Sequence, residues 1–123
     1  MIAQKMPLTP WTEGDAWEGV PAILITTGPD GGPYTAPDSP LTLVTMRFKK
    51  IGDASAPIVE LSSAAAGEIT IVSAATWEIS LPRQIIPGLT AGRWLWQIRC
   101  TDSSANGNPQ TYLEDIAYIR ETV

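Results

Sequence analysis

The chain has 123 residues, the length of one domain, which is enough to bury a hydrophobic core without disulfides. It carries 8 basic and 13 acidic residues, a formal net charge of −5, and this sign disfavours a nucleic-acid partner. Histidine is absent and cysteine occurs once, which excludes Ser-His-Asp and Cys-His catalysis, an internal disulfide and a Cys/His zinc site.

The remaining composition predicts neither a membrane partner nor a cofactor. No stretch approaches the roughly 18 apolar residues of a membrane span, and no run of signal-peptide length precedes the first prolines. The glycine-rich "GPDGGP" lacks the following helix and the lysine of a phosphate-binding loop. One cysteine is consistent with folding in a reducing cytosol.

Short β-branched and aromatic runs, separated by clusters of Gly, Pro, Asp and Asn, predict an all-β fold. In chain order, the first strand is expected over residues 8–12 and the second over 16–27. A turn-rich loop, "GPDGGPYTAPDSP", follows. Residues 41–50 then alternate, and the side chains expected on the buried face are Val44, Met46 and Phe48.

Later strands are predicted over residues 57–61, 68–72 and 76–81, then over a final hairpin formed by residues 91–102 and 111–123 with Asn106-Gly107 in its loop. About seven to eight short strands with turns at this spacing predict an antiparallel β-sandwich. The sandwich is expected over residues 11–123 as a single domain, preceded by an N-terminal arm over residues 1–10.

The segment "AGRWLWQIRCTD" (residues 91–102) holds two tryptophans and the single cysteine. Alternation places its large apolar side chains on one face, which we predict to be buried: Trp94, Trp96, Ile98 and Cys100. A tryptophan pair can instead form a platform for sugar stacking, but two rings in line with Ile and Cys favour a core. Cys100 is then a small hydrophobe that lacks a base to form its thiolate.

The opposite face of that strand carries Leu95, Gln97 and Arg99, which suits either a solvated sheet face or a protein interface. The proline-braced N-terminal arm is a second candidate, because it is short and apolar and is expected to add to a neighbouring subunit's sheet edge or fill a groove. The arm residues expected at an interface are Met1, Ile2, Met6 and Leu8.

Carboxylates occur in two groups. Glu13, Asp15 and Glu18 complete no calcium-loop pattern, so a solvated edge is the favoured interpretation. In "YLEDIAYI", either register places Glu114 or Asp115 inward, unless a β-bulge or an edge position relieves the conflict. We predict edge protection rather than catalysis, because adjacent strand residues point to opposite faces and cannot form an acid pair across a cleft.

Four segments taken in order carry a family resemblance: "EGDAWEGVPAILI", "LTLVTMRFKK", "GEITIVSAATWEISLP" and "LTAGRWLWQIRCTDSSANGNPQTYLED". From about Trp11 onward the chain resembles a family of small tailed-bacteriophage proteins with an immunoglobulin-like β-sandwich, related to the N-terminal module of phage upper-baseplate proteins. Two features depart from the family pattern. Trp94 and Trp96 stand where tyrosine is usual, and Asp115 stands where glycine is common.

The resemblance implies a non-enzymatic virion structural protein, a head decoration or cement protein or a neck, tail or baseplate component. Such a protein folds in the host cytoplasm, self-associates into a homo-oligomer and docks to other virion proteins, and the resemblance brings no catalytic residues. The alternative is a β-sandwich module that binds carbohydrate or a host surface, with the exposed aromatic Tyr34 of the long loop as its platform.

Overall fold

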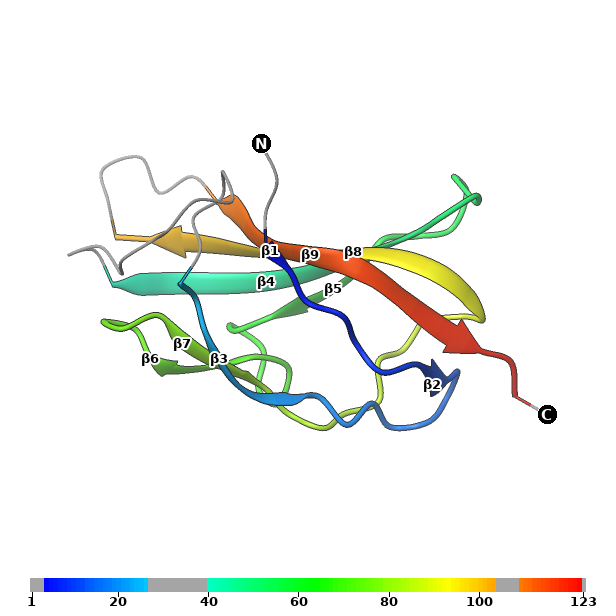
Figure 1. Cartoon of the computed structure of the whole chain (residues 1–123), viewed down its shortest axis with the longest axis horizontal. Helices are drawn as coiled ribbons and strands as arrows, with labels where there is room; N and C mark the ends of the chain where they lie inside the picture. The colour runs from blue at the N-terminus through cyan, green and yellow to red at the C-terminus, as the bar shows by residue number, and fades with distance from the viewer. Residues whose placement is uncertain (1–3, 27–39, 104–108, 123) are drawn as a thin grey trace.

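The computed structural model describes residues 4–26, 40–103 and 109–122, and within these ranges it consists of strands and loops without a helix (Figure 1). The strands are β1 (Gln4–Lys5), β2 (Trp11–Thr12), β3 (Val20–Leu24), β4 (Leu41–Lys50), β5 (Val59–Ser62), β6 (Thr70–Ser73), β7 (Glu78–Leu81), β8 (Gly92–Asp102) and β9 (Gln110–Arg120). The all-β prediction is confirmed. The described ranges hold no helical segment able to cross a bilayer.

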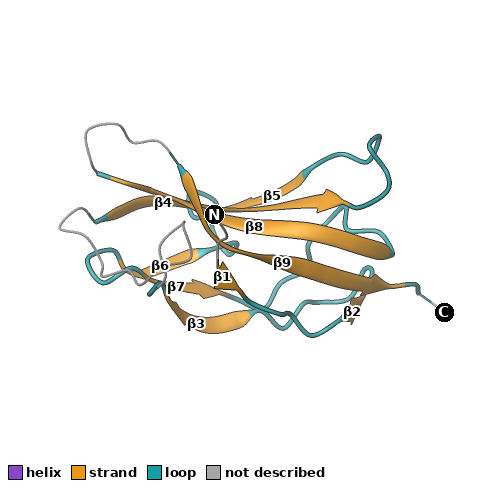
Figure 2. Cartoon of the chain, turned by 45° about the horizontal axis from the view of Figure 1, so that its top comes forward, coloured by secondary structure: helices purple, strands orange, loops and turns teal. Residues whose placement is uncertain are grey.

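The strands form two sheets that face each other (Figure 2). The larger sheet has the order β1-β9-β8-β4-β5, with β2 also paired to β9, and the smaller has the order β3-β7-β6. Both β1 and β2 run parallel to β9, with Gln4 opposite Leu113 and Trp11 opposite Ile119. The expectation of a wholly antiparallel arrangement is therefore wrong at this edge, where the N-terminal segment contributes two short strands.

The core lies between the sheets, and in β4 and β7 it is built by alternation. The predicted bounds of β4 are confirmed, and Val44, Met46 and Phe48 are fully buried. On the facing sheet Ile79 and Leu81 of β7 are fully buried as well. Each of these strands buries one face because successive side chains of a strand point to opposite sides.

The inward side of β8 confirms the predicted core residues Trp94, Trp96, Ile98 and Cys100, all of which are buried. The two rings are only 1% and 0% exposed, so neither is available as a sugar-stacking platform. The indole Nε1 of Trp94 donates a hydrogen bond to the Thr90 carbonyl oxygen at 2.8 Å. These tryptophans therefore serve the fold.

Two strand boundaries near the N-terminus differ from the prediction. The expected strand over residues 8–12 is reduced to β2, because Pro7 and Pro10 have no N–H group for a ladder. The strand expected from residue 16 begins only at Val20, since Trp17 makes an isolated bridge to Gln84 and Gly19 then adopts a positive φ of 76°. A Cβ at position 19 would lie 2.0 Å from a carbonyl oxygen of β7, so only glycine fits.

The pairing of β9 with β8 is irregular at Tyr112. This position is three residues before Asp115, a carboxylate that the alternation of side chains places inward. Ile98 of β8 pairs with Leu113 but Arg99 pairs with Thr111, which leaves Tyr112 as the extra residue of a bulge. The bulge allows two consecutive side chains, Tyr112 and Leu113, to be buried. The Tyr112 ring packs edge-on against Trp77 of the other layer, with ring centroids 5.2 Å apart.

Candidate protein interface

The outward side of the larger sheet presents the three β8 residues that the sequence places opposite the core. Leu95, Gln97 and Arg99 are half-buried and alternate with the fully buried residues of the same strand. Their neighbours on β4 and β9 also turn outward, because directly opposed residues in an antiparallel pair share a face. The structure therefore brings these three residues together on one continuous surface.

A polar row crosses this surface from one edge of the sheet to the other. Gln97 lies between Arg47 of β4 and Glu114 of β9, and its Nε2 donates to a Glu114 oxygen at 3.3 Å. The Arg47 guanidinium binds Glu60 of β5, and the Lys5 ammonium lies 3.6 Å from Glu114. Exposed ion pairs contribute little stability, about 0–1 kcal/mol each, so this row orders the surface more than it stabilises the fold.

A more apolar row runs beside the polar one. Leu95 lies opposite Lys49 of β4 and Ile116 of β9, and Ile58, just before β5, is 59% exposed. A shallow hollow of about 130 Å³ opens between the rows, and its lining residues are Arg47, Lys49, Ile58, Leu95 and Gln97. An apolar centre bordered by polar side chains is typical of a protein-binding surface.

The next positions along the strands extend this surface. Tyr118 of β9 lies opposite Arg93 of β8 and is nearly half exposed. We define the outer-face patch as these outward residues of β4, β8 and β9 together with Ile58: Arg47, Lys49, Ile58, Arg93, Leu95, Gln97, Arg99, Ile116 and Tyr118. Sequence alternation identifies Leu95, Gln97 and Arg99, but the cross-strand register that places the other members beside them is not a local property.

The described part of the N-terminal arm lies on the chain's own sheet (Figure 1). Leu8 is buried in the core and Met6 is half-buried against it, so within one chain both side chains pack on the chain's own sheets, and their place at an interface stays a prediction. The physical reason is that β1 and β2 flank residues 6–10 on the edge of β9, which holds their apolar side chains over the gap between the sheets. Met1, Ile2 and Tyr34 lie outside the described residues.

Cys100 faces the core, as alternation predicts. Burial raises the pKa of its thiol to about 12, so the thiolate needed for nucleophilic attack is scarcely populated near neutral pH. The residue acts as a small hydrophobe of the core between the two sheets.

The N-terminal carboxylates take structural or solvated positions. A Glu13 oxygen accepts a hydrogen bond from the Ala91 N–H at 2.8 Å, and Glu18 lies 3.3 Å from the exposed Arg83 guanidinium. Asp15 is exposed. Within the part of the chain that the structure describes, no three His, Cys, Asp or Glu side chains are grouped to hold a metal ion.

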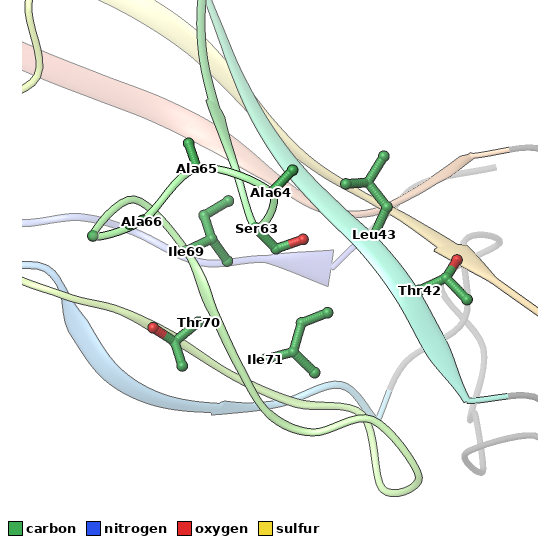
Figure 3. Close-up of a pocket in the computed structure, with 10 residues that line it drawn as sticks. Thr42, Leu43, Ser63, Ala64, Ala65, Ala66, Ile69, Thr70 and Ile71 are labelled. Atoms are coloured by element: carbon green, nitrogen blue, oxygen red, sulfur yellow. The ribbon is translucent and has the colours of Figure 1, made fainter.

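Two further hollows were not foreseen, because each is formed by segments that are distant or irregular in sequence. The larger, about 430 Å³, opens between the start of β4, residues 63–67 and β6 (Figure 3). Its lining side chains are small, aliphatic or hydroxyl-bearing, and its described wall carries no ionisable group. It therefore offers neither an acid–base pair nor a charged anchor.

The second hollow, about 270 Å³, lies between residues 7–11, which join the end of the arm to β2, and residues 16–20. Trp11 and Trp17, stacked with ring centroids 5.4 Å apart, form part of its wall together with Leu8 and Val20. Glu18 also lines it. We call this hollow the arm pocket.

Comparisons with protein-family models, with curated proteins and with solved structures found no match. The function is therefore inferred from the outer-face patch and from the resemblance of the four sequence segments.

Proposed function

We propose that the protein is a non-enzymatic structural component of a tailed-bacteriophage virion, in the head, neck or tail and baseplate. It self-associates and docks to neighbouring virion proteins through the outer-face patch. The observation that carries the proposal is the continuous outward surface of β4, β8 and β9, where Leu95 and Ile116 lie in an apolar row among arginine and lysine side chains.

We also propose that the two sheets form an immunoglobulin-like sandwich, and the strand order supports this. The order β3-β7-β6 corresponds to strands B, E and D of an immunoglobulin domain, and β9-β8-β4-β5 corresponds to G, F, C and C′. In that correspondence the outer-face patch lies on the sheet that contains strands C, F and G.

The composition of the patch supports docking. Arginine and aromatic residues are enriched in protein interfaces, and the patch contains Arg47, Arg93 and Arg99 together with Tyr118. The bonds from Arg47 to Glu60 and from Gln97 to Glu114 hold two of its polar side chains in place before a partner binds, which lowers the entropy cost of association.

Four of the described carboxylates make structural contacts, which favours an architectural function over catalysis. Glu13 and Asp115 accept hydrogen bonds from backbone N–H groups, while Glu60 and Glu114 belong to the polar row. Each is engaged in a contact that holds the fold or the surface together, and the deeply buried Cys100 is not placed to meet a substrate.

The test is incorporation into particles. A phage lacking the gene is complemented with wild-type protein, with Leu95→Asp, or with Leu24→Asp, which alters an exposed leucine on β3 of the other sheet. We expect the wild type and Leu24→Asp in gradient-purified particles, and Leu95→Asp reduced by at least about tenfold, as for loss of a central interface residue. Absence of the wild type from particles, or equal incorporation of Leu95→Asp, would contradict the proposal.

A further inference from the structure

The basic residues are concentrated on one face of an acidic protein. Four of the chain's 8 basic residues belong to the outer-face patch: Arg47, Lys49, Arg93 and Arg99. The carboxylates of the polar row, Glu60 and Glu114, are already bound to Arg47 and Lys5. The patch is therefore a basic surface on a chain whose formal net charge is −5.

This charge pattern disfavours a symmetric face-to-face dimer. A two-fold contact centred on the patch would bring Lys49, Arg93 and Arg99 of one copy close to the same residues of the second copy. Juxtaposed like charges oppose association. A second copy is expected to offer a different, acidic surface to this patch.

The arm pocket provides a surface of that kind. Its rim includes Glu18, whose side chain is 82% exposed and lies 3.3 Å from the Arg83 guanidinium, and the exposed Asp15 lies three residues before it in the chain, so two carboxylates stand against one arginine here. Its floor is apolar, with Leu8, Trp11 and Trp17 among the lining residues. At about 270 Å³ it lies below the roughly 300–1,000 Å³ typical of small-molecule sites, which favours a single protruding side chain as the occupant.

The two surfaces lie at opposite edges of the larger sheet. The arm pocket is lined by residues next to β1 and β2, whereas Ile58 precedes β5 at the other end of the strand order. Ile58 is 59% exposed and lies beside Lys49 on the wall of the outward hollow, so an apolar side chain and a cation protrude together. A contact between opposite edges is heterologous and repeats from copy to copy, closing a ring or extending a filament.

We propose that successive copies of this chain associate head to tail, with Ile58 of one copy seated in the arm pocket of the next and Lys49 facing Glu18 on the rim and Asp15 beside it. This inference rests on the self-association included in the proposed function and names its two surfaces. It predicts association that weakens as salt rises, because the charged rim is exposed to solvent.

Sedimentation velocity of the full-length protein over a range of concentrations tests this arrangement. The wild type is expected to form species larger than a dimer, weakened when salt rises from about 0.05 to about 0.5 M. Ile58→Asp is expected to weaken association at least about tenfold. The matched control is Val72→Asp, which alters a similarly exposed residue of β6 and is expected to associate like the wild type.

A charge exchange makes the test specific. Lys49→Glu and the double variant Asp15→Lys/Glu18→Lys are each expected to associate poorly alone, while an equimolar mixture recovers association because each variant restores the opposite charge for the other. Near-UV circular dichroism confirms that each variant retains native tryptophan packing, and a variant that loses it is replaced by the milder Lys49→Gln or Ile58→Ser.

Three results would overturn the inference: a wild type that stays monomeric, an Ile58→Asp variant that associates like the wild type, or a mixture that fails to recover association. The particle experiment separates this inference from the proposed function. Wild-type protein that enters particles but shows no head-to-tail association in solution refutes the inference alone, whereas absence from particles refutes the proposed function.

Discussion

Trp96 of β8 lies directly opposite Asp115 of β9, so a carboxylate stands on the core-facing side of the larger sheet beside a fully buried indole. Asp115 remains half exposed, and its Oδ1 accepts a hydrogen bond from the Ile116 N–H at 2.8 Å. Along the outer edge of β9, β1 pairs as far as Glu114 and β2 pairs from Ile119 onward. The Asp115 carboxylate therefore accepts from a backbone N–H in the stretch between these two pairings. This contact agrees with the predicted edge protection.

Replacing Asp115 with alanine is expected to lower the free energy of unfolding by about 0.5–1.5 kcal/mol, because the Ile116 N–H loses its acceptor. Asp115→Asn keeps an acceptor oxygen and is expected to lose less. Urea unfolding followed by tryptophan fluorescence measures both. Equal losses for the two variants would show that the hydrogen bond is not the cause.

Substituting alanine at Gly14 and at Gly19 separates two contributions to the loss of stability. The first is the cost of placing a side chain at a positive φ, and the second is the cost of a steric clash. Gly14 and Gly19 both have positive φ, 82° and 76°, but a Cβ at Gly19 would lie 2.0 Å from the Leu81 carbonyl oxygen while one at Gly14 meets open space. Gly14→Ala is expected to cost about 1–2 kcal/mol from conformation alone. Gly19→Ala is expected to cost more than about 3 kcal/mol, because the backbone must move.

Thermal unfolding of the two variants checks this expectation. Similar melting temperatures for Gly19→Ala and Gly14→Ala would contradict the close approach of residue 19 to the β7 strand end.

Cys100 is expected to resist thiol reagents in the native protein and to react at once in denaturant, because the folded core covers it and burial raises its pKa to about 12. Timed labelling with a chromogenic disulfide reagent near pH 8 measures this. Labelling of the native protein as fast as that of the unfolded protein would show that the thiol is accessible.

The raised pKa of Cys100 also leads us to expect a pH dependence of stability. The unfolded thiol ionises near its ordinary pKa of 9.0, whereas the folded thiol keeps its proton up to about 12. Above about pH 9 the folded state therefore binds more protons than the unfolded state, so this group's contribution to stability falls as pH rises through that window. Cys100→Ala is expected to show a shallower loss of unfolding free energy between about pH 8.5 and pH 10, and equal slopes would contradict the shift.

The N-terminal arm is expected to stabilise the monomer through Leu8. Leu8→Ala should lower the unfolding free energy by about 2–4 kcal/mol, since it removes a buried side chain from the core. Lys5→Ala, which removes the exposed 3.6 Å pair with Glu114, is expected to change it by less than about 1 kcal/mol. Chemical unfolding of both variants measures these changes. If the arm were bound only to a neighbouring subunit, neither substitution would change the unfolding free energy of the monomer.

Alternation allowed the long strands to be predicted because their signal is local. In β4 and β8 every second residue is apolar, and the faces of Phe48 and Trp96 follow directly. The parallel pairing of Trp11 with Ile119 carries no such signal, since it joins two-residue strands to the far end of the chain. Alternation did show that one carboxylate, Glu114 or Asp115, would face inward. It did not locate the bulge at Tyr112, because the bulge depends on how Tyr112 and Leu113 both reach the core.

The candidate interface likewise has a part that the sequence predicts and a part that it does not. Leu95, Gln97 and Arg99 follow from alternation in one strand. The partners that turn them into a patch, such as Ile58 and Ile116, depend on the register between strands and on the edge position of β5. The arm pocket depends on a tertiary contact between prolines and tryptophans that no periodic pattern encodes.

The number of copies per particle is the decisive quantity for a structural role in the virion. Quantitative mass spectrometry of gradient-purified virions, referenced to the major capsid protein, measures it. We predict a fixed copy number that matches a virion symmetry, either multiples of three, six or twelve for a neck, tail or baseplate position or hundreds of copies for a capsid surface. A protein absent from the particles, or present in trace amounts that vary between preparations, would contradict this role.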